Sequence, residues 1–122
     1  MAEAFPAFRR VEVRGRPAWH GFLDTGRGRF GVTVVHRPDG RLPYVIPDRP
    51  ALFRRREGGR HRWAPHLFLN GDLCVASQED WDVERDDATT VIAWTAEWLA
   101  TFTTWRITGR DWPCERVEVD FA

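Results

Sequence analysis

The sequence is poor in cysteine, in net charge and in long apolar runs, and each shortage excludes a class of protein. Its 122 residues contain two cysteines, Cys74 and Cys114, which are too few for a disulfide framework and form no C-x-x-C pair. Eighteen basic residues balance eighteen acidic ones, so no net field favours nucleic acid or an anionic membrane as a partner. We therefore expect free thiols, no metal site, and no nucleic-acid or membrane partner.

No apolar run reaches the length that a membrane span needs, and the first residues lack the order of a secretory signal. We therefore expect a cytoplasmic protein. No internal repeat or low-complexity tract divides the chain, and its seven tryptophans and eight phenylalanines supply apolar surface for a core. The sequence thus predicts a single domain over residues 1–122.

The charges are unevenly distributed along the chain. Arginines are concentrated at residues 9–10 and 54–56, and acidic residues at 79–87. A basic face and an acidic loop would suit protein partners, although charge runs are most often ordinary solvated surface.

The first half of the sequence predicts a three-stranded antiparallel meander. Residues 18–24 read as a short strand, residues 26–28 as a turn, and the alternating, β-branched residues 30–36 as a second strand. The turn at residues 37–40, Arg-Pro-Asp-Gly, then closes a hairpin into a third strand at 42–46.

The pattern is weaker after this meander. Residues 51–53 could form a short fourth strand, and Gly58-Gly59 suggests an exposed loop. Residues 63–74 look irregular and extended, with the turn dipeptide Asn70-Gly71 shortly before Cys74.

A helix that starts after Asp86-Asp87 and runs to about Thr108 is the clearest element. Asp86 and Asp87 can cap its first N–H groups, and Gly109 supplies the stop. Apolar or small residues recur at spacings of three and four along one face: Val91, Ile92, Thr95, Trp98, Leu99, Phe102 and Trp105. Residues 116–121 alternate like a final edge strand, which completes an α+β prediction.

The order of these elements resembles the ubiquitin-conjugating (E2) fold. Residues 42–47 are similar to the family's tyrosine- and proline-containing third strand, and residues 66–74 to its His-Pro-Asn and Gly-x-hydrophobic-Cys segment. Trp81 and residues 93–99 resemble the bacterial branch, the prokaryotic E2-like family of defence operons. The resemblance covers residues 18–112. It implies a UBC-like fold, an antiparallel β-meander packed against a C-terminal helix, without most of the usual N-terminal helix.

This resemblance implies that Cys74 is a covalent nucleophile. In the family, the cysteine accepts an activated protein C-terminus from an E1 as a thioester and passes it to an amine. A cysteine with the reference pKa of about 8.5 is mostly protonated near neutral pH, which suits trans-thiolation better than attack on an amide. The implied partners are an E1-like enzyme, a ubiquitin-like protein or other activated C-terminus, and a target protein. No cofactor is implied.

The residues around Cys74 depart from the eukaryotic pattern. Phe68 replaces the motif's Asn, and Leu67 replaces its Pro. Asn70 could supply the missing oxyanion donor, worth roughly 3 kcal/mol, or could be only the turn residue of an Asn-Gly pair. His66 is expected to brace the loop rather than to exchange protons.

The resemblance also places possible gating residues beside the thioester. Asp80 and Asp111 lie where family members border it, and an acid there could orient an incoming amine. Solvated loop charge is the alternative for both. Trp81 is expected to shape the mouth of the site, and Cys114 to be structural.

Three functions are compatible with these features. The first is an E2-type transferase acting through Cys74, in an antiphage defence system. The second is an inactive adaptor of the same fold that binds a modifier or partner without chemistry. The third, a hydrolase pairing Cys74 with His61 or His66, has no protease motif to support it, and no recognised ligand spacing suggests a metal. We expect the transferase.

Overall fold

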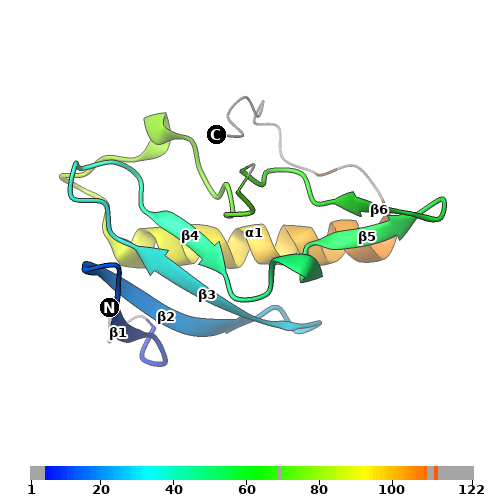
Figure 1. Cartoon of the computed structure of the whole chain (residues 1–122), viewed down its shortest axis with the longest axis horizontal. Helices are drawn as coiled ribbons and strands as arrows, with labels where there is room; N and C mark the ends of the chain where they lie inside the picture. Colours follow the sequence, from blue (N-terminus) through cyan, green and yellow to red (C-terminus); the bar gives the residue numbers. More distant parts are fainter. Residues whose placement is uncertain (1–4, 69, 110–111, 113–122) are drawn as a thin grey trace.

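The computed structural model describes residues 5–68, 70–109 and 112, which form one antiparallel sheet, a separate hairpin and one long helix (Figure 1). Each sheet strand pairs with the next along the chain, so the sheet is a meander. Its strands are β1 (Arg9–Val13), β2 (Arg16–Asp24), β3 (Arg29–Val35) and β4 (Tyr44–Pro47).

The meander has four strands, one more than the sequence predicted. The strands expected at 18–24, 30–36 and 42–46 are present as β2, β3 and β4 with small shifts at their ends. The additional strand is β1, whose residues are mostly exposed and whose apolar alternation is limited to Val11-Glu12-Val13, too short a pattern to indicate a strand. It pairs with β2 through Arg14 and Gly15, which adopt the positive φ angles (52° and 79°) of a two-residue hairpin turn. The described residues before β2 thus contain a strand and no helix.

The prediction of a fourth strand at 51–53 is wrong. Residues Pro50–Leu52 form a single 3-10 turn (η1), closed by bonds from Leu52 N to Arg49 O and from Phe53 N to Pro50 O. Pro50 favours this turn because its ring fixes φ and its missing N–H is not needed at the first position.

Gly58 and Gly59 form the exposed turn of a hairpin that the sequence did not predict. Both have positive φ (59° and 81°), as a two-residue turn requires. The hairpin strands are β5 (Arg54–Glu57) and β6 (Arg60–Trp63). They are dominated by charged residues, so neither shows the pattern of a half-buried strand.

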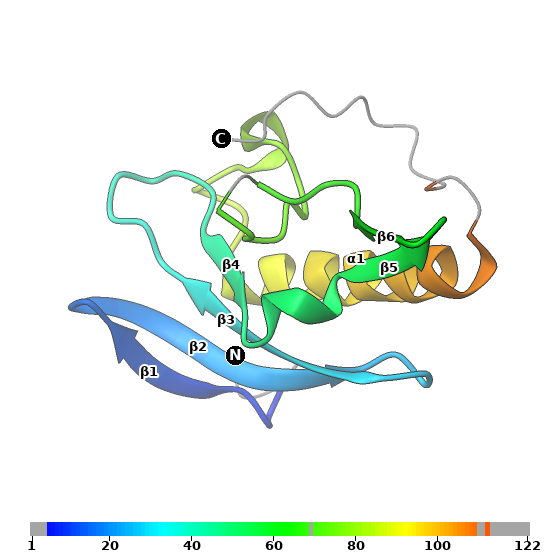
Figure 2. The same ribbon diagram turned by 45° about the vertical axis from the view of Figure 1, so that its right-hand side comes forward.

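The helix α1 (Ala88–Thr108) has the predicted bounds and caps. Asp87 accepts a hydrogen bond from Thr90 N, and Gly109 takes the left-handed conformation with φ of 69°. All seven residues of the predicted stripe are buried. Figures 1 and 2 show α1 lying across one face of the sheet, with the β5–β6 hairpin and residues 64–68 and 70–80 along its other side.

Aromatic rings fill the space between these layers. Phe53 is buried at the centre, with ring centroids 5.5 Å from Phe30, 5.5 Å from Trp98 and 4.9 Å from Phe102. Such offset and edge-to-face pairs add to the stabilisation from burial. The aromatic content of the chain therefore builds the core that holds α1 against β3 and η1.

No helix among the described residues is both long and apolar enough to cross a membrane. The edge strand predicted at residues 116–121 lies outside the described residues, as do Asp111 and Cys114.

Candidate functional site

The segment before Cys74 folds back on itself as a narrow loop. Cys74 N donates to His66 O at 2.8 Å, and Leu67 and Leu73 form an isolated antiparallel bridge. Leu73 N also donates to Val45 O at 2.9 Å, which ties the loop to β4. The backbone at Cys74 is thus fixed from both sides.

Cys74 is 6% exposed, and it lines a cavity of about 390 Å³. Its Sγ lies 3.7 Å from the carbonyl oxygen of Ala76. One part of the cavity lining is apolar: Leu42, Pro43, Tyr44 and Phe68. The polar and charged part consists of Arg37, Arg41, Asn70, Asp72, Ser77 and Gln78. Cys74 is therefore a nearly buried residue that borders a cavity of mixed polarity.

Two long-range hydrogen bonds hold the loop after Cys74 against the connection between β3 and β4. Leu42 N donates to the side-chain oxygen of Gln78 at 3.1 Å, and the indole N–H of Trp81 donates to Gly40 O at 3.1 Å. The Trp81 ring lies edge-on to Trp94, with centroids 6.5 Å apart. The first of these bonds joins two residues of the cavity lining, Leu42 and Gln78.

Asn70 and Asp72 form a mutually bonded pair in the cavity. Asp72 N donates to Asn70 Oδ1 at 2.9 Å, and Asn70 Nδ2 donates to Asp72 Oδ2 at 3.2 Å. Asn70 is therefore the turn residue that its Asn-Gly dipeptide suggests. Its amide nitrogen carries a second N–H besides the one that Asp72 accepts.

The sequence analysis missed Asp72. Burial raises the pKa of this carboxyl above its ordinary value, and the hydrogen bond from Asn70 partly opposes the increase. A signal was nevertheless present, because residues two apart in an extended segment point to the same face. Asp72 stands in that relation to Cys74.

His66 contacts Cys74 through its backbone. Its carbonyl accepts the bond from Cys74 N and a second one, at 3.3 Å, from the indole of Trp98. The buried imidazole packs against Trp112, with ring centroids 5.3 Å apart, and the residue has a positive φ of 61°. This is the geometry of a residue that shapes the loop.

Asp80 and Trp81, two other predicted site residues, lie outside the cavity lining. Asp80 accepts hydrogen bonds from the N–H and hydroxyl of Ser77, at 3.1 and 3.0 Å, within the short η2 turn (Gln78–Asp80). The lining reaches Gln78 but does not include Asp80 or Trp81. Asp111 is outside the described residues.

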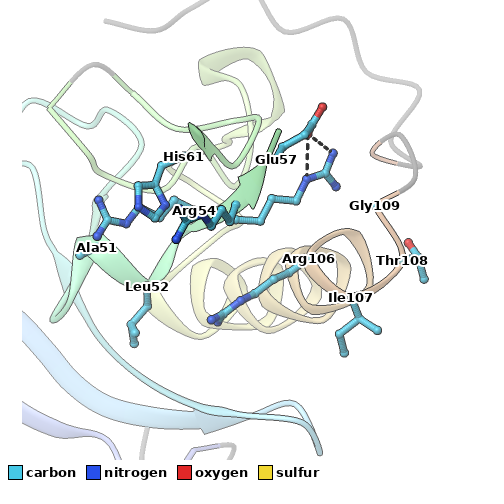
Figure 3. Close-up of a pocket in the computed structure, with 11 residues that line it drawn as sticks. Ala51, Leu52, Arg54, Glu57, His61, Arg106, Ile107, Thr108 and Gly109 are labelled. Atoms are coloured by element: carbon cyan, nitrogen blue, oxygen red, sulfur yellow. Dashed lines mark hydrogen bonds and ion pairs between the residues drawn. The ribbon is translucent and has the colours of Figure 1, made fainter. Parts of the chain in front are cut away.

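A larger groove, of about 680 Å³, lies between β5 and the C-terminal end of α1 (Figure 3). It contains the arginine cluster noted in the sequence, together with Arg106 and His61. Arg55 holds β5 against the end of α1, because its guanidinium donates to Trp105 O at 3.0 Å and forms a 2.8 Å ion pair with Glu57. His61 lines this groove and does not line the Cys74 cavity. This placement does not support a hydrolase that pairs Cys74 with His61.

No group of three or more His, Cys, Asp or Glu within the described residues is placed to hold a metal ion. The groove in Figure 3 contains no cysteine, and Glu57 is its only carboxylate among the described residues. The Cys74 cavity is therefore the better candidate for covalent chemistry, although it is smaller.

Comparison with known proteins gives one extensive match and one short match. The family model E2-CBASS, described as Type II CBASS E2 protein, matches residues 1–119. A protein named zinc metalloproteinase nas-8, from Steinernema carpocapsae, is 51% identical over 39 residues. That match covers 30% of this chain and 9% of that protein, so the chain spans under a tenth of its length. No solved structure matches the chain.

The family match includes the Cys74 loop and α1. The α+β architecture, with its antiparallel sheet and one C-terminal helix, is compatible with an E2-like fold. The chain therefore belongs to the type II CBASS E2 proteins, a bacterial E2-like family of antiphage defence.

Proposed function

We propose that this protein is an E2-type conjugating enzyme. It accepts the C-terminus of a ubiquitin-like or other partner protein as a thioester on Cys74, from an E1-like adenylating enzyme, and transfers it to a target amine. The observation that supports this most is the position of Cys74, on a backbone held by His66 and Val45 and at the wall of a cavity.

The first step is trans-thiolation. The Cys74 sulfur attacks the carbonyl carbon of the incoming thioester, a new C–S bond forms, and the E1 thiolate leaves. The bond formed and the bond broken are of the same kind, so little driving force is required. A fixed backbone favours the step because it holds the sulfur in place before the partner arrives.

The surroundings of Cys74 suggest how the thioester is held. The second N–H of Asn70 can donate to the carbonyl oxygen as it gains charge, and preorganised donors of this kind contribute roughly 3 kcal/mol. Asp80 and Trp81 would act by holding the loop at the edge of the cavity, given their bonds to Ser77 and Gly40.

The test uses the protein with a cognate E1-like enzyme, its modifier and ATP. The wild-type protein and Cys114→Ala should form an adduct that a reductant removes, and Cys74→Ala should not. An adduct that forms equally well in Cys74→Ala would contradict the proposal.

Two observations favour an alternative, the inactive adaptor. The thiol is only 6% exposed, and Phe68 occupies the position of the family's Asn. If this protein is an adaptor, it will bind the modifier or the E1-like enzyme equally well in wild-type and Cys74→Ala forms. In that case neither form will yield a thioester.

A further inference from the structure

We propose that Asp72 is the general base of the transfer step, taking the proton of an acceptor amine as that amine attacks the thioester on Cys74. This inference rests on the proposed function and specifies its acceptor as a primary alkyl amine with an aliphatic stem, such as a lysine side chain.

The placement of Asp72 is the first support. Asp72 and Cys74 both line the cavity, whereas Leu73 between them is 2% exposed and packs in the core. This alternation is that of an extended segment, in which residues two apart share a face. The carboxyl and the thiol therefore face the same space.

The orientation of the carboxyl is the second support. Asn70 bonds both the backbone N–H of Asp72 and its Oδ2, so the side chain is held in one position. Asp72 Oδ1 accepts no hydrogen bond from any residue that the structure describes. That oxygen is available to an incoming N–H.

Asp72 is the one charged residue of the described cavity lining that can accept a proton. The other charged groups of the lining are Arg37 and Arg41, and both lie near Asp39, at 3.7 and 3.6 Å. Asp72 is the only carboxylate among the described residues of the lining. Burial raises its pKa, so it takes up a proton more readily than an exposed aspartate does.

The rest of the lining suits the stem of the acceptor. The apolar wall gives methylene groups a surface to pack on, and it includes Tyr44 and Phe68. A lysine side chain combines such a stem with a terminal amine. A branched or polar acceptor would not use this wall.

The acceptor attacks the thioester as a neutral amine. Its nitrogen lone pair forms a C–N bond to the thioester carbonyl carbon, and the nitrogen's proton passes to the Asp72 carboxylate. The intermediate then breaks its C–S bond, and Cys74 leaves as a thiolate. Asp72 returns the proton to the sulfur or to water, so the products are an amide and the free thiol.

The test separates loading from discharge. Wild type and Asp72→Asn are loaded on Cys74 and freed of E1 and ATP, and the loss of the thioester to free lysine is then timed across the pH range. Asp72→Asn keeps the size of the side chain and the acceptor oxygen for Asn70. We expect about 100-fold slower discharge in this variant, the lower end of general-base effects. The ratio of wild-type to variant rates should fall towards one as the pH is lowered through the raised pKa of Asp72.

Two controls are available. Glu97→Gln removes an exposed carboxylate from α1 and should discharge like wild type. Asn70→Ala keeps Asp72 but removes a hydrogen bond that lowers the pKa of Asp72. The ratio of the Asn70→Ala discharge rate to the Asp72→Asn rate should therefore begin to rise at a higher pH than the ratio for wild type. If loaded wild type and loaded Asp72→Asn discharge at equal rates at all pH values, Asp72 is not the general base, and the proposed function still stands. If wild type forms no thioester at all, the proposed function itself fails.

Discussion

The backbone N–H of Cys74 donates to the carbonyl of His66 at 2.8 Å, so the two residues of the motif are joined through their main chains. The imidazole of His66 packs on Trp112 instead. A loop held in this way depends on the backbone conformation of His66 more than on its ring chemistry.

This relationship predicts how His66 responds to substitution. Its φ of 61° lies in the left-handed region, which Asn tolerates and a β-branched residue does not. His66→Val should be less stable than His66→Asn by about 1–3 kcal/mol, measured by urea unfolding. His66→Asn should still form the Cys74 thioester. If His66→Asn folds but cannot load Cys74, the imidazole takes part in the chemistry.

Arg55 should be the arginine of its cluster on which stability depends. Its guanidinium lies 4.2 Å from the Trp105 ring centroid and donates to Trp105 O, and its side chain is 11% exposed. Arg55→Ala should therefore lower the free energy of unfolding by about 2 kcal/mol. The exposed Arg56 forms no ion pair with a described residue, so Arg56→Ala should change stability by less than about 0.5 kcal/mol. Equal effects in urea titrations of the two variants would contradict this distinction.

The absence of a side chain at Gly21 allows Phe8 to pack on β2. A Cβ at this position would lie 2.6 Å from the Phe8 ring, and Phe8 is buried. Gly21→Ala should lower the free energy of unfolding by about 1–3 kcal/mol through overpacking. The same substitution in a Phe8→Ala background should cost much less, because the ring is absent. A cost that persists in the double variant would place the strain elsewhere.

Asp72 should reduce stability at neutral pH. Its pKa is raised in the folded protein, so its protonated form is favoured there, and stability falls as the pH rises through that pKa. Asp72→Asn cannot ionise. It should therefore be more stable than wild type at neutral pH, and the difference should shrink in acid, where the wild-type carboxyl is protonated. Urea midpoints at several pH values measure this, and a difference that grows in acid has the wrong sign.

The sequence was most informative where local chemistry and burial agree. Asp87 and Gly109 fix the ends of α1 by capping, and the buried stripe sets its face, so the helix could be predicted almost to the residue. The strands β3 and β4 alternate in burial because one side of the sheet is covered.

Elements with exposed or charged residues could not be predicted in the same way. The strand β1 and the β5–β6 hairpin are stabilised by pairing and by long-range contacts such as Arg55 with Trp105, which leave no periodic pattern. For the same reason the sequence identified Cys74 but missed Asp72. The cavity that brings them together depends on contacts between β4 and the loop, which no local motif records.

The proposed function requires that the Cys74 sulfur form a thioester with the C-terminus of a partner protein. The most direct measurement is the intact mass of the Cys74→Ser variant after incubation with the E1-like enzyme, modifier and ATP, followed by peptide mapping. Cys74→Ser should gain the mass of one modifier less one water, attached at position 74 and resistant to reductant, whereas the wild-type adduct should be reductant-sensitive. A mass increase mapped to any other residue, or none in either protein, would contradict it.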